Sequence, residues 1–142
     1  MTEDERRAIE AHCERLIKLY VNLNDAHDWD GCAALYTADA RMGRPSGGPP
    51  IEGRESILAA FNARPPRAQR HTVSNIVVDV ENADNARAFS VIVLYQGDPA
   101  AAGELPAMSA NSPLIGWYRD RLVRTAEGWR FAERIGGLDF KP

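Results

Sequence analysis

The sequence predicts one α+β domain over residues 1–142, a cone-shaped α+β barrel with three N-terminal helices packed on a strongly curved antiparallel sheet. In the N-terminal part, apolar residues recur at steps of three and four, which is the spacing of amphipathic helices. From His71 onward, β-branched residues dominate in runs that polar turns separate. Helices followed by hairpin strands are typical of an α+β fold with an antiparallel sheet.

The helices are predicted from their start signals and their apolar periodicity. Thr2 followed by Glu5 resembles a capping box, so a long first helix begins there and runs to about Asn24. Asp28 can cap a second helix, because its carboxylate can accept hydrogen bonds from the first turn. The two shorter helices are predicted over residues 29–36 and 53–61.

The strands are predicted from runs of β-branched residues and from the turns between them. A short extra strand is expected near Ala40–Met42, before the loop of Gly and Pro at residues 43–50. Residues 97–113 form a long loop rich in Ala, Gly and Pro, either a lid over a pocket or a surface loop. The main strands are predicted over residues 71–80, 86–95, 114–125 and 129–135.

Composition and charge argue against several kinds of partner. A net charge of −3 without a basic stripe gives no electrostatic reason to expect nucleic acid or an anionic membrane. The opening MTEDERRAIE lacks the apolar core of a secretory signal, and no apolar run approaches the roughly 20 residues of a membrane span. Cys13 and Cys32 match no metal or redox spacing, so we expect buried free thiols and a cytoplasmic protein.

His71 is the first candidate for chemistry, because a curved sheet covered by helices encloses a cavity and cavities are the default ligand sites. It opens a strand, with Val73 and Asn75 on the same face by alternation. An imidazole titrates near neutral pH, which suits a general base. A hydrogen-bonded histidine at a strand end is the structural alternative.

Asp25 is the carboxylate predicted to accompany this histidine. Asp28 and Asp30 suit the cap and first turn of the second helix, whereas Asp25 ends the first helix without such a duty. A carboxylate on one imidazole nitrogen fixes the tautomer and raises the basicity of the other nitrogen. Tyr20 can stabilise developing negative charge, but it lies about 140° from Asp25 around a continuous helix. The two converge only if the helix breaks near Asn24.

The remaining candidates are expected to bind substrate. Apolar side chains predicted to face the cavity indicate a small, cyclic, largely apolar substrate. Arg121 either projects inward to steer an anionic substrate or forms a surface ion pair with Asp120 or Glu133. The predicted substrate-binding set is Leu16, Asn24, Phe61, Val73, Asn75, Tyr95, Trp117 and Arg121.

Other catalytic signatures are missing from the sequence. It carries no nucleophile elbow, phosphate loop or dinucleotide fingerprint. His12 and His27 are predicted to be exposed, and with His71 they make no metal-ligand spacing. We therefore expect no metal and no cofactor.

A family resemblance rests on Tyr20, DAHDWDGCAALYTADA at 25–40, GRESILAAF at 53–61, RHTVSNIVVDV at 70–80 and GWYRDRLVRTAEGWRFAER at 116–134. In this order the motifs resemble the SnoaL-like branch of the nuclear transport factor 2-like superfamily. Among its catalytic members, the sequence looks most similar to scytalone dehydratase, bile acid 7α-dehydratase and hexachlorocyclohexane dehydrochlorinase.

The resemblance carries site residues with it. These families pair an aspartate at the end of the first helix with a histidine at the start of a sheet strand, where this chain has Asp25 and His71. Bile acid 7α-dehydratase has a tyrosine five residues before the aspartate, which Tyr20 matches. Scytalone dehydratase has a tyrosine just before its aspartate and a second pocket histidine; this chain has Asn24 and no such histidine.

Two functions from different classes follow. The first is a cofactor-independent lyase or isomerase of the dehydratase kind, in which His71 abstracts a carbon-bound proton, Asp25 orients the imidazole and Tyr20 assists. The second is a non-catalytic small-molecule-binding or assembly module of the same fold. The resemblance also implies a homo-oligomer, a dimer or a trimer.

Overall fold

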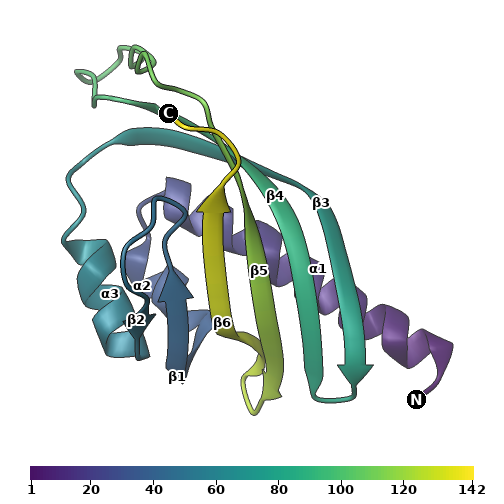
Figure 1. The fold of residues 1–142 in the computed structure, drawn as a ribbon. Coiled ribbons are helices and arrows are strands. Elements are labelled where there is room, and N and C mark those ends of the chain that lie inside the picture. The colour runs from purple at the N-terminus through teal and green to yellow at the C-terminus, as the bar shows by residue number, and fades with distance from the viewer.

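The computed structural model describes residues 1–142, with helices first and a run of strands after them (Figure 1). None of its helices combines the length and the hydropathy that a membrane-crossing segment requires. The helices are α1 (Glu3–Asp25), α2 (Trp29–Ala34) and α3 (Arg54–Asn62). The strands are β1 (Tyr36–Gly43), β2 (Ile51–Glu52), β3 (Ala68–Asn82), β4 (Asn85–Gly97), β5 (Leu114–Thr125) and β6 (Gly128–Leu138).

The predicted helix starts are confirmed. Thr2 caps α1: its side chain accepts from the Glu5 backbone N–H at 3.1 Å, and the Glu5 carboxylate accepts from the Thr2 N–H at 2.7 Å. Asp28 caps α2 by accepting from the Gly31 backbone N–H at 2.9 Å. Helix α2 is shorter than predicted, because Tyr36 leaves it and pairs with Phe131 as the start of β1.

The strands form one six-stranded sheet in the order β2-β1-β6-β5-β4-β3. Strands β3 to β6 are antiparallel neighbours, as predicted. The extra strand expected near Ala40–Met42 is longer than predicted and runs parallel to β6, so the sheet is mixed rather than purely antiparallel. A parallel neighbour needs a long crossover, which the chain between β1 and β6 supplies.

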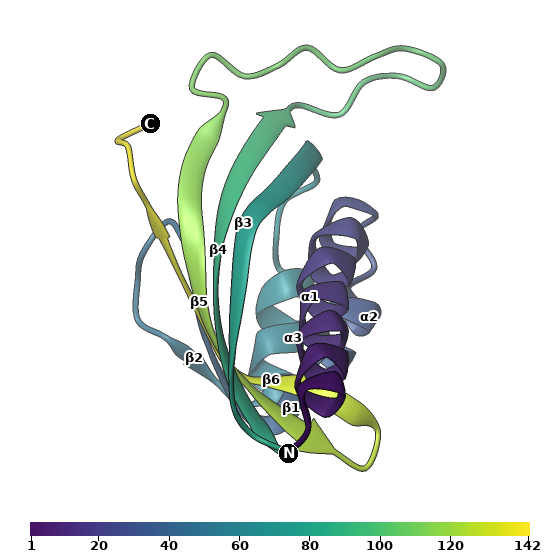
Figure 2. The same cartoon turned by 90° about the vertical axis from the view of Figure 1, so that its right-hand side faces the viewer.

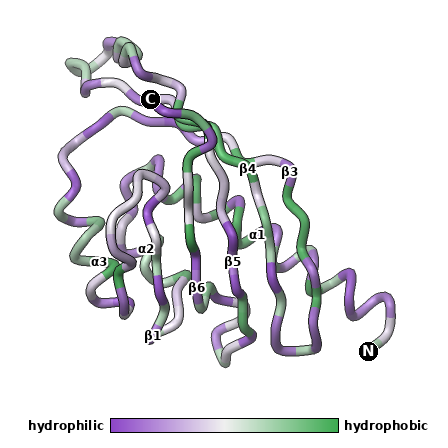
Figure 3. Tube along the Cα trace, viewed as in Figure 1, coloured by the Kyte–Doolittle hydropathy of each residue, from purple (hydrophilic) through white to green (hydrophobic).

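The sheet is curled, and its two edges, β2 and β3, do not pair with each other. All three helices cover one face and leave the other bare (Figure 2). Hydrophobic stretches are clearest along β3 and β4, whereas the start of α1 is hydrophilic (Figure 3). The buried core lies between the helices and the inner face of the sheet, and includes Ile17, Tyr20, Tyr36, Phe61 and Phe131. Further along this inner face, the end of α1 meets the start of β3.

Candidate functional site

Asp25 and His71 are in direct contact where α1 ends and β3 begins. An Asp25 carboxylate oxygen, Oδ1, lies 2.6 Å from Nδ1 of His71. The second oxygen, Oδ2, accepts from the His71 backbone N–H at 2.7 Å. Both side chains are almost fully buried, 3% exposed for Asp25 and 7% for His71. The carboxylate therefore fixes the backbone and the ring of one residue together.

Gln69, two residues before His71 on β3, forms hydrogen bonds to the end of α1. Its side-chain amide donates to the backbone carbonyl of Asn24 at 3.1 Å and to the Asn24 side-chain oxygen at 2.9 Å. A weaker contact of 3.4 Å reaches Oδ1 of Asp25. The Asn24 carbonyl also accepts from the His27 backbone N–H at 3.0 Å, so Gln69 adds a further donor at the end of α1. The exposed Arg70 adds a distant ion pair, 3.9 Å from Asp25.

The imidazole of His71 lines a cavity of about 460 Å³. Nδ1 is engaged by Asp25, and no protein group hydrogen-bonds to Nε2. A carboxylate that accepts from Nδ1–H leaves Nε2 as an unprotonated acceptor in the neutral ring. The volume of this cavity lies within the usual range for small-molecule sites. The arrangement offers a base to a bound molecule.

Tyr20 lies away from this cavity, in the aromatic core. Its hydroxyl is 2.9 Å from the hydroxyl of Tyr36, and burial raises the pKa of its phenol well above the usual range. Helix α1 continues without a break through Asp25, so the two side chains stay about 140° apart. Tyr20 is not among the cavity-lining residues, and the convergence considered for a broken helix does not occur.

Tyr118 is the phenol that lines the cavity with His71. No protein group hydrogen-bonds to its hydroxyl, and burial raises the pKa of its phenol. Sequence reasoning singled out its neighbour Trp117 instead. The parity of β5 carried the signal, because Tyr118 alternates with Asp120 and the fully buried Leu122 on the inner face.

A buried ion pair between Asp120 and Arg134 packs against the ring of Tyr118. Arg134 Nε donates to Asp120 Oδ1 at 2.8 Å, and Nη2 donates to Oδ2 at 3.3 Å. The guanidinium lies 3.8 Å from the Tyr118 ring centroid, and its Nη1 has no partner. Burial raises the pKa of Asp120, and Arg134 opposes that shift. The surface pair of Asp120 with Arg121 is therefore wrong, because Asp120 faces inward.

Two predicted substrate-binding residues belong to the core rather than to the cavity. Phe61 is fully buried and stacks on Trp29 at 5.4 Å between centroids, and Val73 packs against the core cluster. Asn24 does line the cavity. Trp29 lines it as well.

The other four predicted substrate-binding residues on the strands lie outside the cavity. Asn75 sits in a bulge of β3 with a φ of 51°, which breaks the alternation from His71 and leaves it exposed. Tyr95 and Trp117 lie on the bare face of the sheet, where Arg119 covers Trp117 at 4.8 Å. Arg121 is exposed on that face and forms no ion pair; Glu133 pairs with Arg41 instead.

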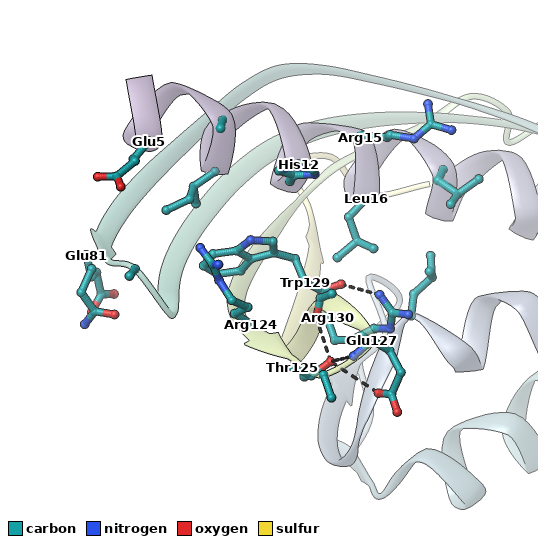
Figure 4. Close-up of a pocket in the computed structure, with 18 of the residues that line it drawn as sticks. Glu5, His12, Arg15, Leu16, Glu81, Arg124, Thr125, Glu127, Trp129 and Arg130 are labelled. Atoms are coloured by element: carbon teal, nitrogen blue, oxygen red, sulfur yellow. Dashed lines mark hydrogen bonds between the residues drawn. The ribbon is translucent and has the colours of Figure 1, made fainter. Parts of the chain in front are cut away.

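A second, larger hollow of about 1290 Å³ lies at the opposite end of α1 and is drawn in Figure 4. It is bounded by α1 and by the β3–β4 and β5–β6 turns, and Leu16 lines this hollow instead of the cavity at His71. His12 is exposed there, as predicted, and has no carboxylate partner. Glu81 and Arg124 already form ion pairs with Arg87 and Asp84. We therefore place the candidate site at His71 despite the smaller volume.

Neither the long loop nor a metal cluster contributes to this site. Residues 98–113 supply no side chain to the cavity lining, although Gln96 and Leu114 on either side do. No group of three or more His, Cys, Asp or Glu side chains lies in an arrangement that could hold a metal ion.

Comparison with protein families gives one match over most of the chain. The family model for the SnoaL-like domain matches residues 5–135. This span runs from the first turn of α1 to β6 and includes Asp25, His71 and Tyr118.

Solved structures share the fold at low sequence identity. A candidate scytalone dehydratase from Novosphingobium aromaticivorans has a TM-score of 0.81 at 19% identity, with 98% of this chain and 89% of that chain covered. A candidate dehydratase of the NTF2-like family from Streptomyces avermitilis has a TM-score of 0.79 at 15% identity, with 95% and 99% covered. A ketosteroid isomerase-like protein from Erwinia carotovora atroseptica has a TM-score of 0.73 at 18% identity, with 92% and 96% covered.

Proposed function

The chain belongs to the SnoaL-like domain family, and we propose that it is a cofactor-independent lyase or isomerase that removes a carbon-bound proton from a small cyclic substrate. The observation that carries the proposal is the 2.6 Å contact between Asp25 and Nδ1 of His71, with Nε2 free of protein partners in a cavity. The names of the dehydratase and ketosteroid isomerase-like neighbours agree with this class of reaction.

His71 acts as the general base in the proposed reaction. Nε2 takes a proton from the carbon beside a carbonyl, and the electron pair of the broken C–H bond forms the enolate. Asp25 keeps Nδ1 protonated and stabilises the imidazolium that results. In a dehydration, the enolate then expels a β-hydroxyl, which leaves as water with the proton returned by His71. In an isomerisation, the same proton returns to another carbon.

Tyr118, rather than Tyr20, supplies the phenol in this proposal. Its hydroxyl is free to donate to the enolate oxygen, because it lines the cavity and no protein group hydrogen-bonds to it. A tyrosine phenol is protonated at neutral pH, and burial raises the pKa of this one further, so it acts as a donor. Tyr20 has a buried hydroxyl partner in Tyr36 and belongs to the core.

Proton exchange tests the base without knowledge of the leaving group. Cyclic ketones and β-hydroxy ketones are incubated with the protein in deuterated water, and deuterium incorporation is followed by mass spectrometry. We expect His71→Gln to lower the rate by about a hundredfold or more, with Asp25→Asn also slowed. His12→Gln is the matched control, because His12 is exposed in the other hollow.

Retained exchange in His71→Gln, or no exchange above the uncatalysed rate with any compound, would contradict the enzymatic proposal. Ligand binding without exchange would favour the second function, a non-catalytic binding module.

We also propose that two copies associate through the bare face of the sheet. Val77 and Phe89 pair on this face and are 58% and 38% exposed, and Tyr95 on β4 is 39% exposed. Val77 and Phe89 are adjacent across the two strands, and contiguous exposed apolar surface is typical of interaction sites. Light scattering should report a dimer that Phe89→Asp converts to a monomer; a monomeric wild type would refute it.

A further inference from the structure

The cavity at His71 carries positive charge without a balancing carboxylate. Three arginines are among its 19 lining residues, and none of the lining residues is Asp or Glu. Asp25 lies behind His71 and is not part of the lining. The chain as a whole has a net charge of −3, so the positive charge at this cavity is opposite in sign to the charge of the whole protein. A cleft lined by one sign of charge attracts ligands of the opposite sign.

The three arginines are Arg44, Arg64 and Arg67, and none of them forms an ion pair. Other arginines near carboxylates are paired, as Arg41 is with Glu133 and Arg87 with Glu81. A guanidinium has five N–H donors and no acceptor. Unpaired guanidiniums at a cavity therefore leave donors available to a bound anion.

Arg64 is the most firmly placed of the three. Its guanidinium stacks over Phe61 at 4.7 Å and Trp29 at 5.4 Å, which fixes its plane at the end of α3. Its one side-chain hydrogen bond, to the Asn24 side-chain oxygen, is long at 3.4 Å. The other donors have no partner in the protein.

A chain of four polar contacts, of 2.6 to 3.4 Å, connects Arg64 to the proposed base. Asn24 accepts from both Arg64 and Gln69, and Gln69 also contacts Asp25, which holds His71. The charge and the base therefore belong to one site. The sheet beside His71 supplies an apolar wall that includes Ile92, Leu94 and Leu114, and Leu94 is the direct pairing partner of His71.

Each arginine of the cavity lies next to a proline in the sequence. Arg44 precedes Pro45, and a Cβ placed on Gly136 would lie only 2.6 Å from Pro45 Cγ, so this loop rests directly on the β6 backbone. Arg64 and Arg67 flank Pro65 and Pro66. Proline restricts the backbone of the residue before it, which limits the conformations of Arg44 and Arg64.

We propose that the substrate of this cavity carries an anionic oxygen group, a carboxylate or a phosphate, which Arg64 binds with help from Arg44 and Arg67. The ring of the substrate lies on the apolar wall beside His71. This inference deepens the proposed function, because it names the substrate class of the same site. It adds an anionic group to the small, cyclic, largely apolar substrate that the sequence indicates.

Calorimetric binding of three naphthalenes tests the proposal without turnover. 2-Naphthoate and 2-naphthyl phosphate carry the anion, and 2-naphthamide keeps the ring without the charge. We expect at least one anion to bind about tenfold or more tightly than the amide, and the stronger of the two identifies the group. Arg64→Gln should weaken the anion by about tenfold and leave the amide unchanged, and Arg64→Lys should recover part of the loss.

Arg121→Gln is the matched control, because Arg121 is exposed on the bare face and should change neither affinity. Arg67→Gln repeats the test at an exposed position should Arg64→Gln fail to fold. Equal binding of amide and anions, equal losses in the Arg64 and Arg121 variants, or no binding at millimolar ligand would overturn the proposal. Arginine-dependent anion binding without His71-dependent exchange would leave it standing and refute only the proposed reaction.

Discussion

The carboxylate of Asp25 binds His71 twice, at the ring and at the backbone. Oδ1 lies 2.6 Å from Nδ1, and Oδ2 accepts the backbone N–H at 2.7 Å. The second bond fixes where β3 starts relative to the end of α1, and the first fixes the rotation of the imidazole. One side chain thus couples the register of a helix and a strand to the orientation of a ring.

This double contact predicts the tautomer of His71. In the neutral ring, Nδ1 should carry the proton and Nε2 should be bare, because a carboxylate accepts from an N–H. Nitrogen-15 NMR of labelled histidine distinguishes the two nitrogens directly. Asp25→Asn should lose this preference, whereas Asp79→Asn, an exposed position on the same strand, should keep it. A neutral His71 protonated on Nε2 in the wild type would contradict the prediction.

The two inner tyrosines should differ in what their hydroxyls stabilise. Tyr20→Phe leaves the buried Tyr36 hydroxyl without its 2.9 Å partner and should lower the free energy of unfolding by about 1–3 kcal/mol. Tyr118→Phe removes a hydroxyl that no protein group engages, so the change should stay within about 0.5 kcal/mol.

Urea unfolding of the two variants, compared with the wild type, measures both values. A larger loss for Tyr118→Phe than for Tyr20→Phe would mean that the Tyr118 hydroxyl has a structural role and would weaken its proposed part in the reaction.

The Asp120–Arg134 pair predicts a large cost for breaking one partner. Asp120→Ala leaves a fully buried guanidinium without its counter-charge and should destabilise the protein by about 3–5 kcal/mol. The double variant Asp120→Leu with Arg134→Met should recover much of this loss, since apolar groups can replace a buried pair.

An exposed ion pair gives the comparison for this test. Glu81→Ala breaks the 2.7 Å pair with Arg87 at the surface, and its cost should be at most about 1 kcal/mol because water screens the charges. Similar losses for Asp120→Ala and Glu81→Ala would show that burial adds nothing to the inner pair.

Local signals explain how much of the architecture the sequence could predict. The capping box at Thr2 and the carboxylate cap at Asp28 act within a few residues, so their effect is visible in the chain. The position of Asp25 was predictable for the same reason, because it follows from the end of α1. Strands β3 to β6 were predictable from period-two runs and turns.

The inward face of β3 and the arginines of the cavity could not be predicted from the sequence. The first depends on an interruption of the strand alternation, and the second on contacts between distant segments. The bulge at Asn75 shifts the inward positions of β3 from His71 and Val73 to Ile76 and Val78, which simple alternation cannot reveal. The arginines of the cavity come from two separate proline-containing segments, residues 44–45 and 64–67, that only the folded sheet brings together. No local pattern connects them.

The two cysteines predict how the protein responds to thiol reagents and to alkali. Both are fully buried, and burial raises the pKa of Cys13 and of Cys32 to about 12. A thiol reagent at pH 8 should modify neither in the native protein and both in urea, because the thiolate is the reactive form. Rapid labelling of the native protein would contradict their burial.

The pKa shifts of the two cysteines determine the direction in which the stability of the protein changes with pH. The folded pKa values, about 12, lie above the ordinary value of 9.0, so the folded state holds its protons more tightly than the unfolded chain. This contribution to stability is complete below pH 9 and declines as the pH rises toward 12. Urea midpoints at pH 8 and pH 10 should therefore fall with pH, and the double variant Cys13→Ala with Cys32→Ala should fall less steeply. An equal slope in that variant would show that the two thiols do not cause the alkaline loss.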